Sequence, residues 1–201
     1  PEVGLHVFLL HWAKSEGSGI AVPVRSPDRA GPLCWLVRRA RSTEGENLRL
    51  YDFHESGNGY KVRLLLSHLG IAHERIELDI LKGETRTEEF LAINPNGRIP
   101  TLVLDDDRVL CESNAILYYL AQGTDYWPAD RFQQAQVLQW MGFEQYSHEP
   151  FIATVRFWTF AGQLAEHEAE LPERRAKGEA ALDVMEPVSY THLTLPTNGC
   201  V

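Results

Sequence analysis

The chain has 201 residues, of which 44% are hydrophobic and 23% are charged, as is ordinary for a globular protein. This length is sufficient for one or two small domains with hydrophobic cores. The formal net charge of −9 argues against DNA or RNA as the main partner, because nucleic-acid-binding surfaces are basic. No apolar run approaches the roughly 20 residues of a membrane span, so we expect no membrane partner.

The cysteines bear on redox chemistry and metal binding. Cys34, Cys111 and Cys200 are far apart in the sequence and form no CxxC pair. This spacing excludes a dithiol redox centre of the usual kind and a cysteine-rich zinc site. The histidines show no metal-ligand spacing either, so we expect no metal. A disulfide scaffold is not expected, and the default location is a reducing cytoplasm.

Residues 1–47 do not show the pattern of a fold. Gly, Ser, Pro and Arg recur there without a helical or strand period. We expect this segment to be disordered or a non-native leader. The alternative is an extra strand or helix near residues 33–37.

The pattern changes at residue 48. Alternating residues over 48–53 predict a strand that runs into a turn. Apolar residues at helical spacing predict a helix over 60–69, which Gly70 ends as a C-terminal cap. Residues 73–78 are predicted to form a second strand, and residues 87–92 a short helix.

The next segment predicts a hairpin and a helix. Strands are expected over 100–104 and Val109–Cys111, with residues 105–107 as the turn between them, followed by a helix over Ser113–Ala121. The resulting order is β-α-β-α-β-β-α. The initial βαβ unit predicts a parallel pair with a right-handed crossover, and the hairpin adds antiparallel strands. The sequence therefore predicts an α/β domain with a mixed sheet over 48–122.

Only helices are predicted in the last part of the chain. Residues 131–160 resemble one long helix rich in aromatic residues, which Pro150 would kink or split. Residues 172–185 predict another helix, with Pro172 in its first turn. We expect residues 129–187 to form an all-α domain.

Three motifs in this order of elements resemble the cytosolic glutathione S-transferase family. They are LYDFHESGNGYKVRLLLSHLGI from Leu50, NPNGRIPTL from Asn94 and CESNAILYYLA from Cys111. The resemblance covers about residues 48–186. It implies a thioredoxin-like, glutathione-binding N-terminal domain over 48–122 and a truncated, partial all-α C-terminal domain over 129–187. It also implies that residues 188–201 are a non-native tail, that glutathione is the co-substrate, and that the full-length parent is a cytoplasmic homodimer.

The resemblance assigns glutathione-binding roles to two short segments. Ile99–Pro100 is expected to be a cis peptide, which offers the backbone of Ile99 to the cysteinyl part of glutathione. Glu112 and Ser113 suit the ammonium and carboxylate of the γ-glutamyl end. A capping serine beside a solvated glutamate is the alternative for that pair. Arg98 is a candidate for the glycyl carboxylate, or a solvated turn charge.

The loop Ser56–Gly59 carries the candidates for thiol activation. A free thiol has a pKa of about 8.5, and hydrogen-bond donors and a helix N-terminus lower it. Ser56 and Asn58 both offer a donor; the sequence does not decide between them, and we favour joint action. The loop has no cysteine, which argues against the thiol-reductase branch of the family. Arg156 is a candidate for the electrophile pocket.

The resemblance therefore implies a detoxifying glutathione transferase that adds glutathione to small apolar electrophiles. The alternatives are a glutathione-dependent disulfide or peroxide reductase, and a non-catalytic interaction or stress-regulatory module of the same fold. Because missing helices would leave apolar surface exposed, we expect the truncated chain to be poorly soluble and weakly active or inactive.

Overall fold

A computed structural model describes residues 48–192 of the chain, with side chains described for residues 48–187. The described residues belong to two units, one ending at Thr124 and the other beginning at Asp125. The predicted leader and residues 193–201 of the predicted tail lie outside the described residues.

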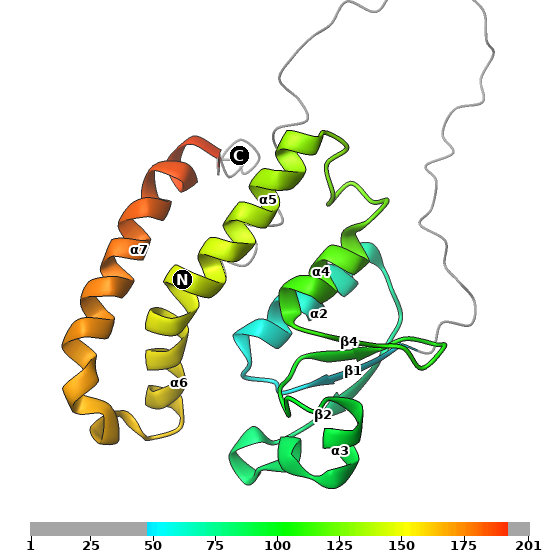
Figure 1. The fold of residues 1–201 in the computed structure, drawn as a ribbon, viewed down its shortest axis with the longest axis horizontal. Coiled ribbons are helices and arrows are strands. Elements are labelled where there is room, and N and C mark those ends of the chain that lie inside the picture. The colour runs from blue at the N-terminus through cyan, green and yellow to red at the C-terminus, as the bar shows by residue number, and fades with distance from the viewer. Residues whose placement is uncertain (1–47, 193–201) are drawn as a thin grey trace, which may run out of the picture. The chain divides into compact units, whose positions relative to one another are not determined.

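The first unit is built on a four-stranded sheet with the strand order β2-β1-β3-β4 (Figure 1). Its strands are β1 (Arg49–Asp52), β2 (Glu74–Glu77), β3 (Thr101–Val103) and β4 (Val109–Cys111). β1 and β2 are parallel, because a helical crossover joins them. β3 is antiparallel to both β1 and β4. This mixed sheet confirms the predicted β-α-β-α-β-β-α order and thioredoxin-like fold class.

Helices cover both faces of the sheet. They are α2 (Gly57–Leu69), α3 (Glu88–Ile93) and α4 (Ser113–Ala121), with two short 3₁₀ turns, η2 (Ile80–Lys82) and η3 (Glu84–Arg86), before α3. Adjacent β1 residues point to opposite faces, as strand geometry requires. The Tyr51 ring packs against Phe90 of α3, with 5.5 Å between ring centroids, whereas the carboxylate of Asp52 lies against Gly59 of α2.

The core of this unit lies between the sheet and the helices α2 and α4. Leu50 of β1, Leu102 of β3, Leu65 of α2 and Ile116 of α4 are completely buried. Burial of one such side chain contributes roughly 1.5–3 kcal/mol. The periodic apolar residues that predicted α2 therefore supply its core face.

The helix α2 begins earlier than predicted, at Gly57 rather than at residue 60. The two glycines of the loop indicated a turn. Ser56 nevertheless caps the helix, since its Oγ accepts a hydrogen bond from the Gly59 N–H at 3.1 Å. The predicted end is confirmed: Gly70 adopts a left-handed conformation, with φ 65°, and closes the helix.

The second unit is helical. It contains α5 (Arg131–Phe143), the π-helical segment η4 (Glu144–Ala153), α6 (Thr154–Phe160), the 3₁₀ segment η5 (Leu164–Glu170) and α7 (Leu171–His192). Pro150 lies within η4, where its missing N–H and its ring disturb the α-helical pattern, as predicted. None of the helices described here is long and apolar enough to cross a membrane.

The helix α7 continues to His192, past the end predicted at Met185. Pro187 lies inside α7 and does not end it. A proline removes one backbone hydrogen bond and kinks a helix, but residues on both sides of it can remain helical.

Candidate functional site

Three strand ends meet at one edge of the sheet. Tyr51 of β1 pairs with Thr101 of β3, which in turn pairs with Cys111 of β4. The chain leaves β1 towards α2 at this edge, enters β3 after Pro100, and leaves β4 towards α4. The strand register therefore brings the ends of all three sequence motifs to one edge of the first unit.

The first turn of α2 carries the two candidates for thiol activation. Ser56 and Asn58 are both half-buried. The Ser56 oxygen accepts from Gly59, so the Ser56 hydroxyl still has its own proton to donate. The first N–H groups of a helix have no partner within it and carry the positive end of the helix dipole. This turn can therefore stabilise an anion.

The first turn of α4 lies next to that of α2. Ser113 is buried, with 4% of its surface exposed, and its Oγ donates a hydrogen bond to Asn58 Oδ1 at 3.3 Å. Because Oδ1 of Asn58 is thereby used as an acceptor, its amide NH₂ group is the part that can donate to a ligand. The structure thus brings together Ser113 and Asn58 from two different motifs.

The start of α4 differs in one detail from the sequence interpretation. Ser113 was a candidate for the N-cap, but Glu112 occupies that position and Ser113 is the first helical residue. The reason is the backbone of Glu112, which adopts φ 66° and ψ 115° and turns the chain from β4 into the helix. Positive φ is uncommon in a residue other than glycine, and such strain clusters at functional sites. The Glu112 side chain is exposed, where a ligand can reach it.

The loop before β3 contains the expected cis peptide between Ile99 and Pro100. The buried residue Asn94, to which the sequence analysis assigned no role, organises this loop. Its Nδ2 donates to the carbonyl of Arg98 at 2.8 Å and to Thr101 Oγ1 at 2.9 Å. The Thr101 hydroxyl also donates to the Arg98 carbonyl, at 3.0 Å. The Arg98 backbone is therefore fixed while its side chain is exposed at the edge of the sheet.

Two further residues, Arg156 and Cys111, belong to neither of these turns. Arg156 lies on α6 in the second unit, and its role at an electrophile pocket stays a prediction. Cys111 precedes Glu112 directly, but burial raises the pKa of its thiol, so the thiol is protonated at neutral pH. Within residues 48–192, no group of three His, Cys, Asp or Glu side chains could hold a metal ion.

Comparison with known proteins places these motifs in one family. Residues 46–122 match the family described as glutathione S-transferase, N-terminal domain. A solved glutathione S-transferase from Pseudomonas fluorescens is 48% identical to this chain. It superposes with a TM-score of 0.67 over 70% of each chain.

Fungal relatives are more distant. The solved glutathione transferase URE2P6 from Phanerochaete chrysosporium, in complex with oxidized glutathione, is 31% identical with a TM-score of 0.60. The match covers 72% of this chain and 68% of that one. The transcriptional regulator URE2 of Saccharomyces cerevisiae is 36% identical over 116 residues, or 53% of this chain. The present chain spans about a third of the length of such curated relatives, 33% in that case.

Proposed function

The chain belongs to the glutathione S-transferase family, and from this we propose that it binds glutathione at the edge formed by β1, β3 and β4 and adds the thiol to small electrophiles. The observation that carries the proposal is the hydrogen bond from Ser113 to Asn58. It joins a turn suited to a thiolate with a turn suited to an α-amino acid. Glutathione contains both groups in one small molecule.

The proposed binding mode follows from the charges of glutathione. The exposed carboxylate of Glu112 pairs with the γ-glutamyl ammonium. The first N–H groups of α4, including that of Ser113, bind the adjacent carboxylate, with which the helix dipole interacts favourably. The Ser113 hydroxyl meanwhile keeps its hydrogen bond to Asn58 Oδ1. The backbone of Ile99 pairs with the cysteinyl residue as an added strand would. Arg98 pairs with the glycyl carboxylate.

The proposed reaction has two steps. The glutathione thiol first loses its proton to water, and the resulting thiolate accepts hydrogen bonds from the Ser56 hydroxyl and the Asn58 amide. The sulfur then attacks an electrophilic carbon. With an aryl halide, a carbon–sulfur bond forms and the halide departs with the electron pair of the broken carbon–halogen bond. The site lowers the barrier by stabilising the thiolate and holding it near the electrophile.

A second candidate reaction is the reduction of a small disulfide by glutathione. The relative URE2P6 binds oxidized glutathione, which is the product of such a reaction. The thiolate would attack a sulfur atom of the disulfide and release the other sulfur as a thiolate. A second glutathione would then resolve the mixed disulfide, so the protein would need no cysteine of its own.

The test is a calorimetric titration of the full chain with glutathione, together with turnover of an aryl halide and of a small disulfide. We expect saturable binding that Ser113→Ala weakens about tenfold, since it removes the hydrogen bond that positions Asn58, and such a bond contributes about 0.5–1.5 kcal/mol. Ser67→Ala, at an exposed position on α2, is the matched control and should bind as the wild type does. No binding by folded wild-type protein would overturn the proposal.

The turnover measurements with the two substrates distinguish the candidate functions. Conjugation of the aryl halide supports the transferase, and reduction of the disulfide alone supports the second reaction. Binding without either reaction would favour a non-catalytic module, as the regulatory name of the yeast relative suggests.

A further inference from the structure

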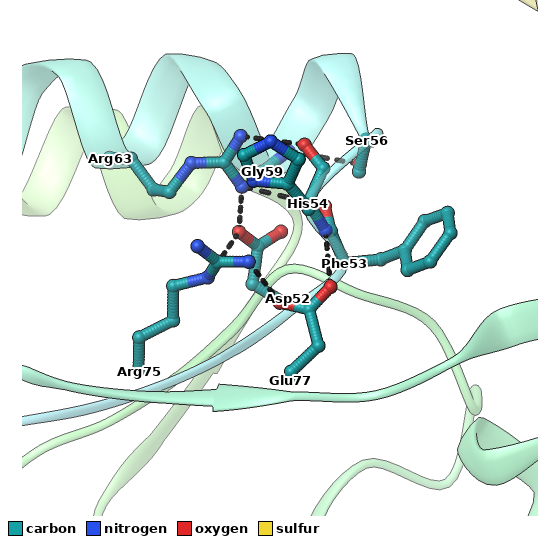
Figure 2. A network of polar contacts seen from close by, with 8 residues as sticks. All are labelled: Asp52, Phe53, His54, Ser56, Gly59, Arg63, Arg75 and Glu77. Carbon is teal, nitrogen blue, oxygen red and sulfur yellow. Dashed lines mark hydrogen bonds and ion pairs between the residues drawn. The ribbon is translucent and has the colours of Figure 1, made fainter.

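A buried carboxylate lies directly beneath the thiol-activating loop. Asp52 ends β1 and has 0% of its surface exposed. Its Oδ2 forms ion pairs with Arg63 of α2 and, at 3.6 Å, with Nε of Arg75 of β2 (Figure 2). Arg75 also pairs with Glu77, so two carboxylates and two guanidinium groups form one neutral cluster. We call these four residues the loop-support cluster.

The loop-support cluster also bonds to the backbone of the loop. Arg63 donates to the carbonyl of His54 at 2.9 Å and, at 3.4 Å, to that of Phe53. Glu77 Oε1 accepts the N–H of His54 at 2.6 Å. The Phe53 carbonyl also accepts the N–H of Ser56 at 2.9 Å. Side chains from α2 and β2 therefore hold the peptide groups that lead to Ser56 (Figure 2).

Asp52 also contacts the helix turn itself. A Cβ atom added to Gly59 would overlap the carboxylate of Asp52 and lie 2.6 Å from its Cγ. Gly59 is therefore required by its close approach to Asp52. The N–H of the same glycine donates to Ser56 Oγ, so the packing of Gly59 against Asp52 also places the N–H group that Ser56 caps.

The simpler explanation is that these charges only stabilise the fold, but stability alone does not explain their burial. Buried ion pairs add little net stability, because desolvation offsets their attraction. Within the described part of the chain, Asp52 Oδ1 has no hydrogen-bond partner, which adds to this cost. The loop-support cluster bears this cost and bonds to successive peptide groups of the loop that leads to Ser56. It is therefore suited to fixing that loop in one conformation.

We propose that Asp52, acting through Arg63, is a positioning residue that holds Ser56 and Asn58 where they can donate to the glutathione thiolate. Arg63 makes the link because its guanidinium reaches the Asp52 carboxylate and the loop carbonyls at once. The inference rests on the proposed function. It concerns activation of the thiol rather than recognition of the γ-glutamyl and glycyl ends, which involves other residues.

The test measures the apparent pKa of the bound glutathione thiol in the full chain, from the pH dependence of thiolate absorbance, beside the dissociation constant for glutathione. We expect Arg63→Gln to raise this thiol pKa by about one unit, which corresponds to a tenfold fall in the ratio of thiolate to thiol at a given pH. The dissociation constant, measured below the thiol pKa, should change by less than about threefold, since the residues that bind the two ends are retained.

Two further variants distinguish positioning of the loop by Arg63 from an effect of its positive charge alone. Arg63→Lys keeps the positive charge beside Asp52 but loses the forked geometry, so it should not restore the thiol pKa. Arg49→Gln removes an arginine of β1 that lies outside the loop-support cluster and pairs with Asp107 at 2.6 Å. It should leave the thiol pKa unchanged. If Arg63→Gln does not fold, Arg63→Lys carries the test, because it retains the ion pair.

The outcomes separate this inference from the proposed function. Wild-type protein that binds no glutathione would overturn the proposed function and this inference with it. Wild-type protein that binds glutathione and lowers its thiol pKa, with folded Arg63 variants that do the same, would overturn the positioning role alone. Restoration of the thiol pKa by Arg63→Lys would also overturn it, in favour of a role for charge only.

Discussion

Ser113 Oγ donates a hydrogen bond to Asn58 Oδ1 across 3.3 Å, although the two residues are 55 positions apart in the sequence. The bond connects the first turn of α4 to the first turn of α2. In the proposed binding mode, the backbone N–H of Ser113 contacts the γ-glutamyl carboxylate and the amide group of Asn58 contacts the sulfur. The two ends of the ligand site are therefore coupled through the protein as well as through the ligand.

The first prediction concerns this coupling. Asn58→Ala and Ser113→Ala should each weaken glutathione binding, and the double variant should lose less than the sum of the single losses. The expected difference is about 1 kcal/mol, because each single variant already breaks the shared hydrogen bond. Calorimetric titration of the four proteins measures it. Strict additivity would contradict the coupling.

The second prediction separates helix capping from catalysis at Ser56. Ser56→Ala removes the cap of α2 and should lower the free energy of unfolding by about 1 kcal/mol. Thr87→Ala removes the corresponding cap of α3, where Thr87 Oγ1 accepts from the Phe90 N–H at 3.3 Å, and should cost a similar amount. Only Ser56→Ala should also raise the pKa of the bound glutathione thiol.

Denaturant unfolding and the thiol titration together check this prediction. A Ser56→Ala protein that loses stability but keeps the low thiol pKa would show that Ser56 is only a cap. Thiol activation would then be assigned to Asn58 alone.

Local patterns in the sequence were sufficient to predict the framework of the first unit. The spacing of Val62, Leu65 and Leu66 predicted the buried face of α2, and Gly70 predicted its end, because both signals depend only on neighbouring residues. The family motifs gave the candidate residues at the three strand ends. The start of α2 was misjudged because the capping role of Ser56 competes with the turn preference of two glycines.

Long-range partners could not be predicted in this way. Nothing near Asp52 in the sequence indicates that Arg63 and Arg75 neutralise it, since those contacts depend on how α2 and β2 pack beside β1. Asn94 was likewise missed. An Asn-Pro-Asn-Gly run predicts a turn, but the bonds from Asn94 to Arg98 and Thr101 require the folded loop.

The third prediction concerns Glu112, whose side chain is exposed and whose backbone has positive φ. Glu112→Gln keeps the backbone geometry and removes only the charge. We expect the free energy of unfolding to change by no more than about 0.5 kcal/mol, as for other surface substitutions. Glutathione affinity should fall at least tenfold, since a charge-assisted bond of about 1.5–3 kcal/mol is lost.

The control for Glu112→Gln is Glu89→Gln, an exposed carboxylate in the first turn of α3. It should leave the glutathione affinity unchanged. Equal affinities of the wild type and Glu112→Gln would remove Glu112 from the binding site.

The fourth prediction concerns the pH dependence of stability. Burial raises the pKa of the Asp52 carboxyl above its ordinary value of 3.8, although the guanidinium groups of Arg63 and Arg75 act in the opposite direction. The folded protein therefore holds the Asp52 proton more tightly than the unfolded chain does. As the pH rises from 3.8 through the folded-state pKa, this group must lower the free energy of unfolding.

The difference in unfolding free energy between the wild type and Asp52→Asn isolates this effect. It should decrease as the pH rises above 3.8, by about 1.4 kcal/mol for each unit by which the pKa is raised. Asp79 is the matched control, because its pKa is shifted in the opposite direction. A hydrogen bond from Lys82 holds the pKa of Asp79 below its ordinary value, so the difference between the wild type and Asp79→Asn should decrease as the pH falls below 3.8. Urea unfolding at a series of acidic pH values measures both differences. A difference for Asp52→Asn that rises with pH would mean that the arginines, rather than burial, dominate at Asp52.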